Sequence, residues 1–149
     1  MKYPIGIQTF SRIRENGYVY IDKTALIHQL VSRGSIYFLS RPRRFGKSLM
    51  ISTLEAYYEG RKELFEGLAI AGLEKDWFQY PVFHIDFNGD NFAKEGVLEA
   101  AIEGYLGNWE DMYGKNPNYT TPGTRFIELL RRASEKTCLL YTSDAADEL

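Results

Sequence analysis

Residues 41–48, which read RPRRFGKS, constrain the fold of this chain more than any other part of its sequence. Seven of the eight positions fit the phosphate-binding pattern G-x-x-x-x-G-K-[ST], and Arg41 replaces the first glycine. Before this loop, the apolar run at 35–40 shows no helical period and predicts a buried strand. After it, apolar residues at helical spacing predict a helix from Lys47 to Gly60. Strand, loop and helix in this order form the context in which such a loop binds phosphate.

Each residue type in the pattern serves phosphate binding. Backbone N–H groups of the loop form a nest for an anion, and Gly46 lets the backbone approach the phosphate closely. Lys47 would reach the β- and γ-phosphates, and the helix beginning there would direct its positive end at them. We therefore expect ATP and Mg²⁺ as cofactors, with the Ser48 hydroxyl as the metal ligand. The residues expected to bind the nucleotide are Arg41, Pro42, Arg43, Arg44, Phe45, Gly46, Lys47 and Ser48.

Two other interpretations of the loop remain open from the residues alone. One is a basic surface turn before an ordinary helix. The other is that the three arginines at 41, 43 and 44 contact the phosphate backbone of a nucleic acid.

The remaining patterns alternate between helix and strand. Residues 17–21 predict an extended segment, and residues 25–31 predict a helix with Asp22 as its N-cap and Gly34 at its end. Residues 64–73 predict a broken helix or turn, and residues 81–87 predict a second buried strand. Helices are predicted over residues 93–113 and from Thr121-Pro122 onward.

Buried strands that alternate with helices favour an α/β fold of P-loop NTPase type, with a mainly parallel sheet flanked by helices. Only two strands are convincing, so the predicted sheet is incomplete. A chain of 149 residues suffices for one domain, and its net charge of -2 gives no global basic field for nucleic acid. No secretory signal and no run of about 18 apolar residues is apparent, so we expect a cytoplasmic protein without a membrane segment. The oligomeric state is not predicted.

The chain resembles the AAA-ATPase-like family of bacterial and archaeal P-loop proteins. The matching segments within residues 3–137 are PIGIQTF (4–10), GYVYIDKT (17–24), YFLSRPRRFGKSL (37–49), ELFEGLAI (63–70), PVFHIDF (81–87) and RF (125–126). The stretch SRPRRFGKS is specific to this family, whose own pattern has arginine in place of the first glycine.

The resemblance implies an ATP-binding fold in which Lys47 and Ser48 contact phosphate and magnesium. Many members carry a PD-(D/E)XK nuclease-like domain after the ATPase-like part. Asp22-Lys23-Thr24 matches a family motif to which we assign no function, and a helix cap is the structural alternative for Asp22.

Hydrolysis needs an acidic group near the magnesium, and in this family a strand ending in Asp-Glu follows the helix that matches residues 125–136. That strand is missing here, and Asp86, which precedes Phe87, is interpreted as a structural strand end. Residues 138–149, including the single cysteine Cys138, resemble the translation of a transposase adaptor used in sequencing libraries. We therefore expect residues 1–137 to be the N-terminal part of an AAA-ATPase-like domain, and residues 138–149 to be a non-native tail.

Three functions follow from these patterns. The first is Mg-nucleotide binding by part of an ATPase-like module that lacks the acidic strand for hydrolysis. The second is a non-catalytic nucleotide or anion sensor. The third is the ATPase part of a nucleic-acid-processing nuclease protein, whose contact with nucleic acid would come through a downstream domain.

Overall fold

The computed structural model describes residues 2–40, 42, 44–88 and 91–136, and the chain divides into two compact units, Met1–Val82 and Phe83–Leu149. The predicted non-native tail at 138–149 lies outside the described residues. The first unit contains α1 (Phe10–Glu15), α2 (Thr24–Arg33), α3 (Lys47–Tyr58), the 3-10 helix η1 (Lys62–Phe65) and α4 (Ala69–Leu73). The second unit contains α5 (Val97–Tyr113) and α6 (Pro122–Lys136).

The predicted mainly parallel sheet is wrong. Within the described residues the structure has no β-sheet, and an isolated parallel bridge joins Lys2 and Tyr18. The predicted strand at 35–40 is irregular and turned to solvent, with Ile36 92% and Phe38 94% exposed. The predicted strand at 81–87 is also irregular, and Ile85 and Phe87 are exposed. A strand requires a second strand to pair its backbone groups, and the described part of the chain supplies none to either segment.

The helix predictions are confirmed with shifted boundaries. α2 ends at Arg33 with Gly34 at its C-cap, and its N-cap position is Lys23, one residue after the predicted Asp22. α3 begins at Lys47 as predicted. The broken region at 64–73 resolves into η1 and α4, and Gly67 between them has a φ of 74°.

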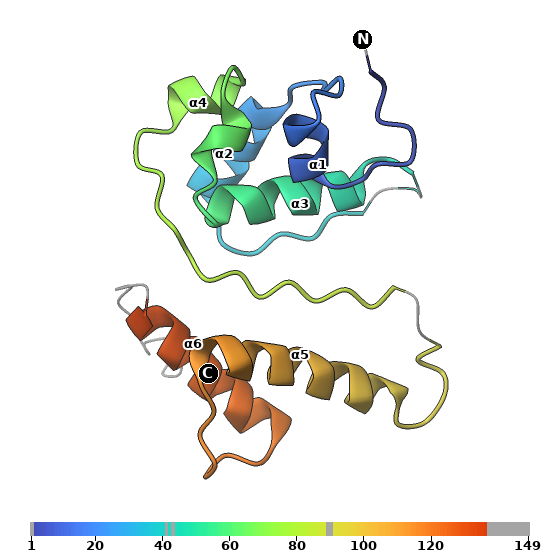
Figure 1. Ribbon diagram of the computed structural model, residues 1–149, viewed down its shortest axis with the longest axis vertical. Helices are drawn as coiled ribbons and strands as arrows, with labels where there is room; N and C mark the ends of the chain where they lie inside the picture. The colour runs from blue at the N-terminus through green and yellow to red at the C-terminus, as the bar shows by residue number, and fades with distance from the viewer. Residues whose placement is uncertain (1, 41, 43, 89–90, 137–149) are drawn as a thin grey trace. The chain divides into compact units, whose positions relative to one another are not determined.

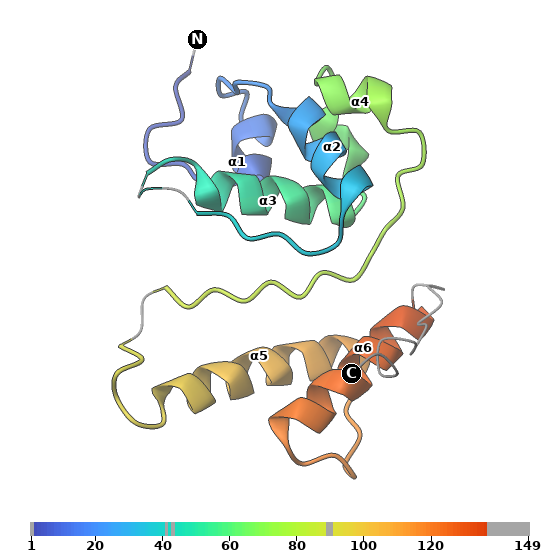
Figure 2. The same cartoon turned by 180° about the vertical axis from the view of Figure 1, so that it is seen from behind.

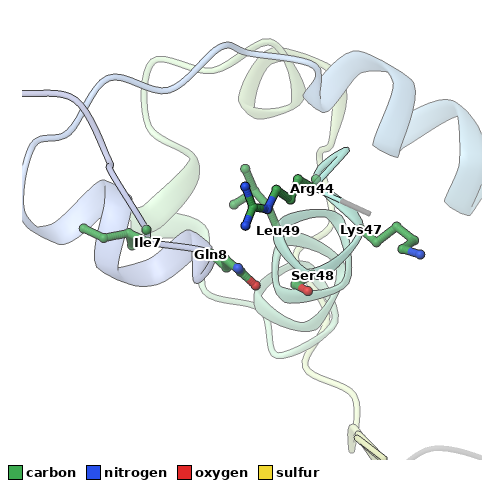
Figure 3. A pocket seen from close by; sticks show the side chains of 8 residues that line it. Ile7, Gln8, Arg44, Lys47, Ser48 and Leu49 are labelled. Atoms are coloured by element: carbon green, nitrogen blue, oxygen red, sulfur yellow. The ribbon is translucent and has the colours of Figure 1, made fainter. Parts of the chain in front are cut away.

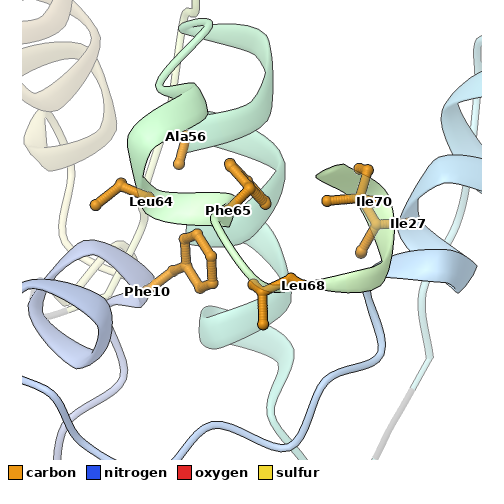
Figure 4. Close-up of a cluster of buried hydrophobic side chains, with 7 residues drawn as sticks. All are labelled: Phe10, Ile27, Ala56, Leu64, Phe65, Leu68 and Ile70. Carbon is orange, nitrogen blue, oxygen red and sulfur yellow. The ribbon is translucent and has the colours of Figure 1, made fainter. Parts of the chain in front are cut away.

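A cluster of apolar side chains organises the first unit around α3. α1 packs against α3 and η1, while α2 packs against α4. Figures 1 and 2 show α1, α2 and α4 on the same side of α3. Figure 4 shows the buried members of the cluster, which are Phe10, Ile27, Ala56, Leu64, Phe65, Leu68 and Ile70. This core fixes the position at which α3 begins, and therefore the position of the loop that precedes it.

The second unit is a pair of packed helices with a separate core. α5 packs against α6, and their contact is built from Leu106, Trp109 and Leu129 with the ring of Phe83 at 4.9 Å from that of Trp109. The Thr121 hydroxyl accepts the Thr124 N–H at 3.4 Å, which places Thr121 as the cap of α6, as predicted. α5 begins at Val97, four residues after the predicted start, behind the left-handed Gly96. None of the helices in the described ranges combines the length and the apolar character needed to cross a bilayer.

Candidate functional site

The predicted phosphate-binding loop turns sharply into the N-terminus of α3. Arg44 has a φ of 66°, and Gly46 at the N-cap has φ 73° and ψ 22°, so both adopt the left-handed conformation. The Met50 N–H donates to the Gly46 carbonyl at 2.9 Å, which closes the first turn of the helix. The first N–H groups of any helix lack an acceptor within the helix, so this end of α3 offers donors and a positive dipole end to an anion.

A pocket of about 560 Å³ lies against this helix end. Its lining residues are Gly6, Ile7, Gln8, Arg44, Gly46, Lys47, Ser48 and Leu49. Figure 3 shows the Arg44 and Gln8 side chains on one side of the start of α3, whereas Lys47 extends to the other side. Two cationic side chains, a hydroxyl and an amide therefore gather around one helix N-terminus, which is a combination suited to an anion.

Ser52 attaches the N-terminal wall of this pocket to α3. Its hydroxyl accepts the Phe10 N–H at 3.0 Å and lies 3.3 Å from the Gln8 carbonyl oxygen and 3.0 Å from that of Leu49. Phe10 itself is completely buried in the core. The segment that contains Gln8 is thereby held beside α3 although it lies about forty residues earlier in the chain.

Of the eight residues predicted to bind the nucleotide, four line the pocket or its edge in a described position: Arg44, Gly46, Lys47 and Ser48. Pro42 is described but does not line this pocket, and Phe45 lines a neighbouring one. Arg41 and Arg43 lie outside the described residues. Sequence reasoning did not identify Gln8 as part of the site, although it lies within the PIGIQTF segment.

Asp86, the residue weighed as an acidic group for hydrolysis, belongs to the second unit. Its carboxylate accepts the Asn88 N–H at 2.9 Å, and its backbone N–H and carbonyl both contact the Tyr105 hydroxyl. These contacts fix a turn and tie it to α5. They agree with the structural interpretation of Asp86, although the residue follows an irregular segment and not a strand.

Asp22 and Thr24 of the Asp-Lys-Thr motif join α2 to α4. One oxygen of the Asp22 carboxylate accepts the Thr24 N–H at 2.8 Å and the Thr24 hydroxyl at 2.6 Å. The other accepts the Ala69 N–H at 2.7 Å, and the fully buried Thr24 hydroxyl accepts the Ile70 N–H at 3.1 Å. Desolvation opposes ionisation of Asp22, but the hydrogen bonds from Thr24 and Ala69 outweigh it and lower the pKa of the carboxylate.

These contacts give the Asp-Lys-Thr motif a structural function. Asp22 caps the start of α4, whose first N–H groups would otherwise lack partners, while it also orders the start of α2. The sequence suggested a helix cap for Asp22. It did not indicate the second helix, because that contact spans 47 residues.

The comparisons with known proteins cover the loop and the segments around it. The family model described as Predicted AAA-ATPase matches residues 4–139. A protein of Azotobacter chroococcum mcd 1, described as an uncharacterized protein in the vnfD 5' region, is 43% identical over 134 residues. The match covers 89% of this chain and 26% of that protein, so the chain spans about a quarter of its relative's length. No solved structure matches the chain. With most of its length matched, the chain belongs to the predicted AAA-ATPase family.

Proposed function

We propose that the loop at 41–48 and the N-terminus of α3 bind the phosphates of a Mg²⁺–ATP complex. The observation that carries this proposal is the pocket at the start of α3, where Arg44, Gly46, Lys47 and Ser48 of the phosphate-binding pattern line one cavity. Membership of a family described as predicted ATPases supports the choice of ATP as the anion. As a nucleotide-binding protein, the chain would act in the cytoplasm, where Mg-ATP is present.

Four of the eight lining residues have a defined task in this proposal. The ammonium of Lys47 and the guanidinium of Arg44 neutralise phosphate charge, and the left-handed Gly46 brings backbone N–H groups close to the phosphate oxygens. The Ser48 hydroxyl ligates Mg²⁺. Within the described ranges no group of three or more His, Cys, Asp or Glu side chains gathers to hold a metal. The remaining magnesium ligands would therefore be phosphate oxygens and water, which is the usual arrangement for this ion at a nucleotide.

The proposal for this chain is binding without appreciable turnover. Hydrolysis requires an acidic or equivalent group that orders the attacking water, and the eight described residues that line the pocket include no carboxylate. Turnover, and any coupling to a nuclease or to nucleic acid, would need groups other than those that line this pocket. The relative from Azotobacter chroococcum, of which this chain covers 26%, has the length to carry such additional parts.

Calorimetric titration of the chain with Mg-ATP tests this proposal. Wild type should bind, and Lys47→Ala should weaken binding by at least about tenfold, because a charge-assisted contact to phosphate contributes about 1.5–3 kcal/mol. Lys62→Ala is the matched control, since Lys62 is an exposed lysine in η1 of the same unit and lines none of the pockets described above. Its affinity for Mg-ATP should equal that of wild type.

Phosphate release measured on the same samples separates binding from hydrolysis. We expect no release above that of the Lys47→Ala variant. Equal affinity of wild type and Lys47→Ala for Mg-ATP would refute the phosphate site, whereas Lys47-dependent phosphate release would refute the absence of turnover and leave the site in place.

A further inference from the structure

A second, apolar pocket adjoins the proposed phosphate site within the first unit. Its volume is about 580 Å³, within the roughly 300–1,000 Å³ range of small-molecule sites. α2 contributes Leu26 and Leu30, α3 contributes Leu49 and Met50, and the phosphate-binding loop contributes Phe45. Aromatic and aliphatic side chains therefore form most of its wall, whereas four of the eight residues that line the pocket at the start of α3 have polar or charged side chains.

The two pockets share part of their lining. Gly46 and Leu49 line both, so the apolar pocket begins where the polar one ends, across the first turn of α3. A nucleoside triphosphate has a similar division, with a highly charged chain at one end and a flat, uncharged heterocycle with apolar faces at the other. The order of the two pockets thus matches the order of the two chemical parts of one molecule.

Apolar side chains at this pocket are more exposed than a packed core allows. Leu26 on α2 is 61% exposed, and Phe45 in the loop is 64% exposed. Covering them with a ligand would remove apolar surface from water, which is favourable at roughly 25 cal/mol per Å². Phe45 also presents an aromatic ring on which a base can stack, because every base has a π-face.

The polar side chains in the pocket interior leave the apolar character intact. Thr53 is buried, and its hydroxyl donates to the Leu49 carbonyl at 2.7 Å, so it is already occupied. The charged residue among the lining side chains is Lys23, which is exposed at the N-cap of α2. An uncharged, flat group with apolar faces therefore suits the interior, whereas a second phosphate or a sugar phosphate does not.

From this arrangement we infer that the apolar pocket holds the nucleobase of the nucleotide whose phosphates occupy the pocket at the start of α3. This inference rests on the proposed phosphate site. It assigns Phe45 and Leu26 as residues that contact the base, and it makes the ligand a complete nucleoside triphosphate instead of any polyphosphate anion.

Titration of the 149-residue chain with two probes tests the inference. The probes are Mg-ATP and Mg-tripolyphosphate, which has the phosphate chain but no base. The variants are Phe45→Ala, which removes the ring, and Leu26→Gln, which adds polarity to the wall of the pocket. Glutamine is a good helix former, so α2 should remain intact. Because glutamine is uncharged, the substitution does not change the electrostatic interaction with the phosphates. Leu73→Gln is the control for Leu26→Gln, because Leu73 is an exposed leucine of α4 that does not line this pocket.

Phe45→Ala and Leu26→Gln should each weaken Mg-ATP binding about tenfold. Leu26→Gln should leave Mg-tripolyphosphate binding unchanged, and Phe45→Ala, which lies in the loop itself, should weaken Mg-tripolyphosphate binding less than Mg-ATP binding. Leu73→Gln should change neither the affinity for Mg-ATP nor that for Mg-tripolyphosphate, and circular dichroism should show equal helix content in all variants. If both pocket variants bind Mg-ATP as tightly as wild type, the base lies elsewhere and the inference fails, while the phosphate site stands. If wild type binds neither probe, the proposed function fails and the inference fails with it.

Discussion

The Asp22 carboxylate contacts the first turns of two helices, α2 through Thr24 and α4 through Ala69. Both of its oxygens act as acceptors, and the donors are backbone N–H groups and the Thr24 hydroxyl. Replacing the carboxylate by an amide would keep one oxygen as an acceptor and replace the other by an NH₂ group. The NH₂ group would then face either Thr24 or Ala69. In either orientation a backbone donor would face another donor.

Asp22→Asn should therefore destabilise the chain by about 1–2 kcal/mol at neutral pH, the usual cost of losing a helix cap. The folded pKa of Asp22 is lowered from 3.8. Its stabilising contribution is fully present above that unfolded value and is lost as the pH falls through the folded pKa. The difference between wild type and Asp22→Asn should shrink accordingly below pH 3.8.

Urea unfolding followed by circular dichroism at several pH values measures both effects. Asp111→Asn on the exposed surface of α5 is the control, and it should match wild type at every pH. A denaturation midpoint of Asp22→Asn equal to that of wild type at pH 7 would contradict the capping function.

Among the elements, the helices from α2 onward were predictable from the sequence, whereas the short helix α1 was not predicted and the predicted strands were wrong. The pattern from Lys47 onward gave the start of α3, because apolar residues at helical spacing and a preceding glycine are local features. The apolar runs at 35–40 and 81–87 indicated strands, but a strand depends on pairing with a distant segment that periodicity does not reveal. The location of the loop at the start of α3 was thus predictable, while the participation of Gln8 and the two-helix contact of Asp22 were not.

The start of α3 depends on the left-handed conformation of Gly46, which has a φ of 73°. A Cβ added there would meet nothing within 4 Å, so the cost of Gly46→Ala comes from the backbone alone. We expect a loss of about 1 kcal/mol in unfolding free energy for Gly46→Ala, and a smaller loss for Gly46→Asn, because asparagine tolerates this conformation better than alanine.

Gly72 within α4 provides the comparison for Gly46. A Cβ added to Gly72 would also meet nothing within 4 Å, but the φ of Gly72 is not positive. Gly72→Ala should stabilise the chain by about 0.5–1 kcal/mol, since alanine is the better helix former. Thermal and urea unfolding of the three variants give the sign of the change in unfolding free energy for each. If Gly46→Ala stabilised the chain, the left-handed turn at Gly46 would not be needed.

At the scale of the whole molecule, the chain consists of two units whose buried apolar clusters share no residue. Each unit has one of the two tryptophans: Trp77 packs against the first core, and Trp109 lies in the second. The variants Trp109→Phe and Trp77→Phe would each leave one tryptophan, whose fluorescence reports on one unit. The division into units can therefore be tested by perturbing one core and observing both.

The buried ion pair between Arg125 and Glu110 is the contact through which the second unit is best perturbed. The Arg125 guanidinium, only 9% exposed, makes bidentate contacts to the Glu110 carboxylate of α5 at 2.7 and 2.9 Å and a third contact to Glu103 at 2.5 Å. The hydrogen bonds from Arg125 outweigh desolvation and lower the pKa of Glu110. Glu110→Gln would leave a buried guanidinium without its bidentate partner, and breaking such a pair costs several kcal/mol.

Glu110→Gln should shift the unfolding transition seen by Trp109 to a lower urea concentration. The shift should correspond to a loss of about 3 kcal/mol in unfolding free energy, a low value for a broken buried pair, because Glu103 still contacts Arg125. The transition seen by Trp77 should not move, because the first core shares no residue with the second. Glu135→Gln is the control: it breaks the exposed contact to Arg131 and should shift neither transition, since exposed pairs contribute little. Equal shifts of both transitions in Glu110→Gln would mean that the chain unfolds as a single cooperative unit, and the loop at the start of α3 would then depend on the integrity of α5 and α6.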